Sequence, residues 1–130
     1  MLILFCTGSS WTASANMVLY CTQEISTGLV FKDGSWKQAN FKPERFALKV
    51  VGDWQGINKG DDKLSCYHGG EFKGYFPVIC RNTKEWKTQT INIDKYSLRF
   101  VYTNVSVGGY ASTSSDPDTD EIAAGKCENF

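Results

Sequence analysis

Short runs that alternate between polar and apolar residues follow one another along this chain, and they constrain its fold more than any other feature. Residues 17–23, 45–51 and 86–93 are three such runs. A period of two places successive side chains on opposite faces of a strand, as a half-buried antiparallel sheet requires. No long stretch has the 3.6-residue apolar period of a helix. The sequence therefore predicts an all-β domain, a single small antiparallel barrel or sandwich of about eight to ten short strands.

Turn-forming residues separate these runs. Asp33-Gly34 lies between the runs 28–32 and 35–38. It predicts a tight hairpin, because both central positions of such a turn take positive φ. The glycine- and aspartate-rich residues 52–62 are expected to be the least ordered internal segment, and residues 112–120 to form an exposed loop. A short helix is the alternative for residues 45–51. Further strands are expected at residues 64–67, 75–80, 97–102, 105–111 and 122–130.

The first fifteen residues read as part of an export signal. They carry no charge, and Ala13-Ser14-Ala15 fits the small residues that precede a signal-peptidase cut. The apolar run is short and no basic residue precedes it, so residues 1–15 are interpreted as a signal-like segment that is truncated or lies inside a longer signal. A buried first strand is the alternative. Residues 16–130 then form one domain, and no run of about 20 apolar residues predicts a membrane-spanning helix.

The cysteines indicate disulfide bonds. Removal of the signal-like segment takes Cys6 away and leaves four cysteines, an even number that is typical of disulfides in small exported domains. Of the three possible pairings we favour Cys21–Cys127, which joins the opening strand to the closing one, and Cys66–Cys80, which clamps a hairpin. The sequence contains no Cys-x-x-Cys pair, so a zinc site is not expected. The predicted location is periplasmic or secreted.

Composition excludes two classes of protein. The chain has 14 basic and 14 acidic residues, so it lacks the basic excess of a nucleic-acid-binding protein. Its 42% hydrophobic content is too high for a disordered chain.

No catalytic residue stands out. His68 is the only histidine and precedes Gly69-Gly70, which is similar to an oxyanion-hole loop. A Gly-x-Ser-x-Gly elbow and a second histidine are missing, so His68 is expected at a hairpin tip. Acidic residues are frequent, but no pair of them is singled out for glycoside hydrolysis. No cofactor is predicted, and an enzyme is the less favoured class.

Three residues are candidates for recognition: Trp54, inside the glycine-rich segment, and Tyr67 and His68 near the hairpin tip. Aromatic side chains in turns suit contacts with a carbohydrate or a partner. Trp36 and Trp86 are instead expected in the core.

One acidic cluster, Asp116, Asp118 and Asp120, is a weak calcium candidate because three carboxylates lie close together. The EF-hand pattern requires Gly at its sixth position and Glu at its twelfth, where this chain has Glu121 and Cys127. A solvated turn is the favoured interpretation.

Several short motifs resemble those of a group of small exported bacterial proteins of unknown function. They are Leu-Tyr-Cys-Thr at 19–22, Glu24-Ile-Ser-Thr-Gly28, Val30-Phe-Lys-Asp-Gly-Ser-Trp36, Asn40-Phe-Lys-Pro43 and Ala124-Gly-Lys-Cys-Glu-Asn-Phe130. The resemblance implies export and a compact β fold, and it carries over no functional residue. With a cysteine near each end of the mature domain, the chain is also similar in architecture to the periplasmic inhibitors of c-type lysozyme.

These observations favour a monomeric binding or inhibitory module of the cell envelope, whose partner is a protein or a carbohydrate. The alternatives are a carboxylate-dependent envelope hydrolase and a β-barrel that carries a small ligand.

Overall fold

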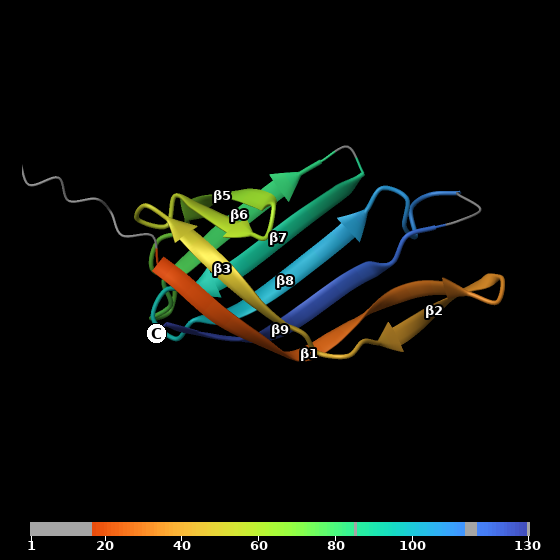
Figure 1. Cartoon of the computed structure of the whole chain (residues 1–130), viewed down its shortest axis with the longest axis horizontal. Helices are drawn as coiled ribbons and strands as arrows, with labels where there is room; N and C mark the ends of the chain where they lie inside the picture. Colours follow the sequence, from red (N-terminus) through yellow and green to blue (C-terminus); the bar gives the residue numbers. More distant parts are fainter. Residues whose placement is uncertain (1–16, 85, 114–116, 130) are drawn as a thin grey trace, which may run out of the picture.

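The computed structural model describes residues 17–84, 86–113 and 117–129, which form nine β-strands and no helix (Figure 1). The signal-like segment 1–15 and Cys6 lie outside the described residues. No helix in the described part of the chain is long and apolar enough to cross a membrane. The strands are β1 (Met17–Lys32), β2 (Ser35–Asn40), β3 (Arg45–Val51), β4 (Gly56–Lys59), β5 (Asp62–His68), β6 (Pro77–Thr83), β7 (Lys87–Asp94), β8 (Arg99–Ser106) and β9 (Asp120–Asn129).

The strands form a closed antiparallel barrel, and this confirms the all-β prediction. From β3 onward each strand pairs with the next in the chain, and β9 returns to pair with β1. β1 is long enough to pair with β3 through its first half and with β2 through its second half. The barrel therefore has eight strands, and β2 is an additional strand. In Figure 1 the β1–β2 hairpin extends beyond the rest of the barrel.

β1 corrects the expectation of two separate strands at 17–23 and 28–32. It is one continuous strand whose pairing with β9 shifts register between Gln23 and Ile25. A bulge inserts one residue and changes which face the following side chains occupy. Gln23 and Ser26 are both buried although they are three residues apart. The bulge therefore interrupted the alternation in the sequence without interrupting the strand.

The predicted hairpin at Asp33-Gly34 is confirmed. The two residues have φ values of 54° and 79°, and they connect β1 to β2 through the pair Lys32 and Ser35. Glycine accepts positive φ without steric cost, and aspartate tolerates it better than most residues.

The glycine-rich segment 52–62 is more ordered than predicted. It contains β4, which pairs with β3 on one side and β5 on the other, and Ile57 of β4 is fully buried. The strand predicted at 105–111 is also wrong, because β8 ends at Ser106 and turns follow it. Strands on both sides pair with the first segment, whereas no described strand pairs with the second segment beyond residue 106.

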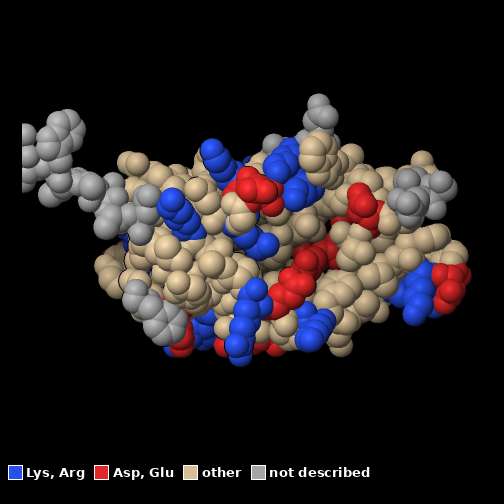
Figure 2. Space-filling view, viewed as in Figure 1, with Lys and Arg blue, Asp and Glu red and all other residues tan. Residues whose placement is uncertain are grey.

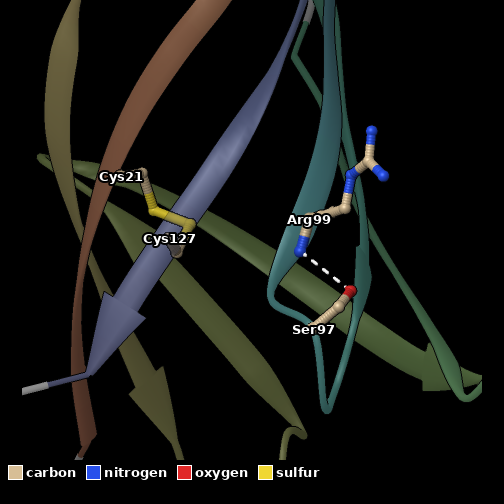
Figure 3. Close-up of a disulfide and its surroundings, with 4 residues drawn as sticks. All are labelled: Cys21, Ser97, Arg99 and Cys127. Carbon is tan, nitrogen blue, oxygen red and sulfur yellow. Dashed lines mark hydrogen bonds between the residues drawn. A yellow bond between two sulfur atoms is a disulfide. The ribbon is translucent and has the colours of Figure 1, made fainter.

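Both predicted disulfides are present, and they confirm the favoured pairing. Cys21 and Cys127 lie directly opposite each other on β1 and β9, where the barrel closes (Figure 3). The backbone N–H of Cys127 donates to the carbonyl of Leu98, in the turn where the Arg99 N–H also donates to the Ser97 hydroxyl. The Cys21–Cys127 disulfide therefore joins the first and last strands of the barrel, close to the start of β8.

The apolar core fills the part of the barrel that contains the disulfides. Its largest fully buried side chains come from six strands: Leu19, Cys21, Leu48, Val50, Ile57, Val78, Cys80, Ile91, Ile93 and Cys127.

The burial of Trp54 and Trp86 is the reverse of the expectation, and Trp36 lies between the two. Trp54 is only 7% exposed and belongs to the core, whereas Trp86 is 57% exposed. Trp36 is partly buried and makes edge-to-face ring contacts with Phe31 and Tyr110. Sequence neighbours could not show this, because the burial of Trp54 depends on strands that come later in the chain.

Candidate functional site

One end of the barrel interior is polar. Strand register places Asn82, Gln89, Asn104 and Glu121 side by side on β6, β7, β8 and β9. Opposed residues of antiparallel strands have Cβ atoms about 5 Å apart, so these side chains form one row. We call the end of the interior that this row lines the barrel mouth.

The next row inward is apolar apart from one hydroxyl. It consists of Cys80, Ile91, Tyr102 and Ala123, which are at most 4% exposed. A single step of two residues along each strand thus separates the core from the barrel mouth.

Asp62, the first residue of β5, is the charged centre of the mouth. Its carboxylate accepts hydrogen bonds from the ammonium groups of Lys84 and Lys87 and, at 3.1 Å, from the Gln89 amide. The Lys84 hydrogen bond, aided by those from Gln89 and Lys87, lowers the pKa of Asp62 from 3.8 to about 2 against the opposing effect of burial. Asp62 is therefore ionised in the folded protein at neutral pH.

Tyr102 connects this charged centre to the core. Its hydroxyl oxygen accepts a 3.1 Å hydrogen bond from the Gln89 amide, and burial raises the pKa of the phenol. The Lys59 ammonium lies 5.0 Å from the centroid of the Tyr102 ring and 5.1 Å from that of Phe46. Cation–π contacts of this kind attract the Lys59 ammonium to the two aromatic rings.

Two buried amide oxygens in the row have no hydrogen-bond partner in the structure: Gln89 Oε1 and Asn104 Oδ1. Gln89 is 2% exposed, and its amide nitrogen already donates to Asp62 and Tyr102. An unsatisfied buried acceptor costs about 1–3 kcal/mol, so native proteins contain few of them. Two such acceptors on paired residues of one row indicate a place where a ligand or a water donates a hydrogen bond.

A pocket of about 300 Å³ opens next to this row. Its lining consists of Trp86, Lys87, Asn104, Ser106, Asp118 and Thr119, and we call it the Trp86 pocket. The volume is at the lower end of the range for small-molecule sites. Its lining is mostly polar, and Trp86 is the one aromatic residue in it.

The loop between β8 and β9 holds one wall of the Trp86 pocket in place. The Ser106 hydroxyl lies 2.8 Å from Asp118 Oδ2 and 3.2 Å from the Trp86 carbonyl oxygen. Asp120 accepts hydrogen bonds from the backbone N–H groups of Ser106 and Tyr110. A Cβ on Gly109 would lie 2.4 Å from an Asp120 oxygen, so any larger residue there would displace this carboxylate.

Two of the three calcium candidates have structural roles in this loop. Asp118 and Asp120 accept hydrogen bonds from the chain itself, and Asp116 lies outside the described residues. Among the described residues, no group of three or more His, Cys, Asp or Glu side chains is placed to hold a metal ion.

The predicted recognition residues do not meet at the mouth. β5 starts at the mouth with Asp62 and ends at His68, about 20 Å away at strand spacing. His68 precedes the loop 69–76, as expected near a hairpin tip, and its Nε2 lies 3.3 Å from the Asp53 carbonyl oxygen. Tyr67 is 58% exposed, but the indole of Trp54 is buried and leaves little surface for a partner.

Charges of both signs surround the mouth. In the view of Figure 2, acidic side chains form a line along a hollow of the molecular surface, and basic side chains lie on either side of it. The described charged residues of the mouth include Lys59, Asp62, Lys84, Lys87, Asp118 and Glu121.

Sequence reasoning missed the residues that make this site. Trp86 was expected in the core, and Asn104 was marked only as the start of the glycosylation sequon Asn104-Val-Ser106, which does not predict a binding site. The one available signal was a change from apolar to polar residues at inward positions, such as Ile91 to Gln89 and Tyr102 to Asn104. This signal can be interpreted only when the register is known.

No family model, curated protein or solved structure matches this chain. The site therefore has to be interpreted from its own geometry.

Proposed function

We propose that this protein is an exported binding module of the cell envelope and that it holds its partner at the barrel mouth. One observation carries the proposal: the exposed indole of Trp86 borders a polar pocket that adjoins two buried amide oxygens without partners. An exposed aromatic ring and an unpaired buried polar group are both unfavourable in an empty site, and contact with a ligand stabilises both.

A hydrolase is less well supported. A general acid needs a raised pKa, whereas the pKa of Asp62 is lowered to about 2 by its three hydrogen-bond donors. Ser26 donates to Glu121 and Ser106 to Asp118, so these two carboxylates also have structural partners.

A carrier of a small apolar ligand is also less well supported. Such a carrier needs an apolar cavity inside the barrel. Leu19, Leu48, Ile57, Val78 and Ile91 fill the interior with no exposed area. The end that opens to solvent is polar and favours a polar partner.

An exported location agrees with the disulfides, which persist in oxidising compartments. The resemblance to exported bacterial proteins and to lysozyme inhibitors motivates the same location. An inhibitory role would be one form of the proposed binding function, with a protein as the partner.

Native mass spectrometry of the protein purified from its own source, under non-reducing conditions, tests the proposal. We expect a bound partner whose mass is absent from the Trp86→Ala variant and present in Trp36→Ala, the matched control. A protein that stays bare after incubation with every fraction of the envelope contradicts the proposal. So does turnover of an envelope substrate that a single carboxylate substitution abolishes.

A further inference from the structure

We infer that the Trp86 pocket takes a neutral, hydroxyl-bearing sugar ring, which lies on the indole of Trp86 and donates a hydroxyl hydrogen bond to Asn104 Oδ1. This inference rests on the proposed function and names its ligand class. It starts from the three features that the pocket combines: an exposed aromatic face, an unpartnered acceptor and charges of both signs.

The backbone of Trp86 is held in place, and its side chain is exposed. Its carbonyl oxygen accepts a 2.8 Å hydrogen bond from the Val107 N–H and lies 3.2 Å from the Ser106 hydroxyl. The backbone is therefore tied to the end of β8 while the ring remains 57% exposed. An indole is a broad apolar face, and it suits the C–H face of a pyranose, a ligand that is apolar on its faces and polar at its rim.

The unpartnered oxygens define what the ligand must supply. Asn104 lines the pocket, and its buried Oδ1 lacks a donor. Rotation about the last side-chain bond of an asparagine is soft, so this oxygen can turn toward the pocket. Gln89, directly opposite Asn104 on β7, carries the second unpartnered oxygen. Because Gln89 does not line the pocket, the donor that a ligand must supply there is the one to Asn104.

The charges select against an ionic ligand. A cation in the pocket would meet Lys87, and an anion would meet Asp118. A sugar hydroxyl can accept from an ammonium and donate to a carboxylate or amide, because it is both donor and acceptor. A neutral polyhydroxyl ligand suits this mixed lining because it places no net charge beside a group of the same sign.

The experiment measures binding of cellotriose, maltotriose and chitotriose by tryptophan fluorescence and by calorimetry. We expect at least one trisaccharide to bind, and Asn104→Leu and Trp86→Ala each to weaken it by about tenfold or more. Trp36→Ala is the matched control and should bind as the wild type does. Asn104→Leu should keep the wild-type melting temperature or exceed it, because it removes an unsatisfied acceptor rather than a made bond. If Asn104→Leu binds the sugar more weakly but keeps its melting temperature, Asn104 has a binding role rather than a structural one.

Two outcomes would overturn the inference. One is that none of the three sugars binds with a dissociation constant below about 10 mM, a free energy weaker than about 3 kcal/mol. The other is binding that neither pocket substitution changes. If the sugars fail but the source-purified protein carries a protein partner that Trp86→Ala removes, the sugar inference falls and the proposed binding function stands. If both experiments fail, both proposals fall.

Discussion

The two ends of the barrel interior differ in what they contribute. The closed end holds the disulfide Cys21–Cys127 and side chains such as Leu48 and Ile93, which are at most 1% exposed. The mouth holds the ionised Asp62 and two amide oxygens without partners. The same strands run through both ends, so the fold supports the mouth with stability gained elsewhere. Proteins commonly place unsatisfied polar groups where a ligand satisfies them.

The largest effect expected at the closed end comes from its disulfide. In the loop-entropy model, replacing Cys21 and Cys127 by alanine lowers the free energy of unfolding by about 4–5 kcal/mol, because the bond closes a loop of 106 residues. Replacing Cys66 and Cys80, which are 14 residues apart, should cost about 3 kcal/mol. Urea unfolding of both variants measures the difference. A larger loss for the shorter loop would contradict this ranking.

A core truncation should come next. Leu48→Ala removes a fully buried side chain from β3 and should lower the free energy of unfolding by about 2–5 kcal/mol through lost burial and a cavity. Sugar binding at the mouth should keep its affinity in the folded fraction. Thermal unfolding and calorimetry check the two expectations, and a loss of affinity would show that the two ends are coupled.

Acid should weaken the mouth. The folded pKa of Asp62 lies below its unfolded value, so its stabilising effect is complete above about pH 4 and is lost as the pH falls from about 4 toward 2. The side chain is 19% exposed, and screening by solvent reduces the contribution to about 1–2 kcal/mol. Asp62→Asn should remove this part of the pH dependence in urea unfolding.

Asp94 provides the comparison at the opposite turn. The backbone N–H groups of Phe76 and Ser97 lower the pKa of its carboxyl group, which also stabilises the fold above the unfolded pKa and less so in acid. Asp94→Asn should therefore flatten the same pH range without changing ligand binding at the mouth. If Asp62→Asn leaves the acid dependence unchanged, the charged centre of the mouth does not have the role described.

The smallest effect should have the opposite sign. Asn104→Leu replaces an unsatisfied acceptor with an apolar side chain, and it should change stability by less than about 1 kcal/mol or raise it. Gln89→Leu, in the adjacent strand, removes made bonds to Asp62 and Tyr102 and should lower stability. Chemical unfolding of the two variants distinguishes an acceptor that is available to a ligand from a side chain whose hydrogen bonds stabilise the fold.

Much of the fold could be predicted because its determinants are local or nearly so. A period of two specifies strands and Asp33-Gly34 specifies a hairpin. The four cysteines that follow the signal-like segment indicated two disulfides. The bulge after Gln23 and the short β4 were missed. The first changes the period without ending the strand, and the second depends on two partner strands more than on its own residues.

The site depended on the tertiary structure. The sequence by itself determined that inward positions change from apolar to polar along β7 and β8, at Ile91 to Gln89 and Tyr102 to Asn104. Only the register, and the closure of β9 onto β1, decided that these polar residues lie in one row beside Trp86. The physical reason is that a shift of one residue in any strand pair would move every side chain of that strand to the opposite face. Contacts between distant strands select the register, and no short stretch of sequence contains them.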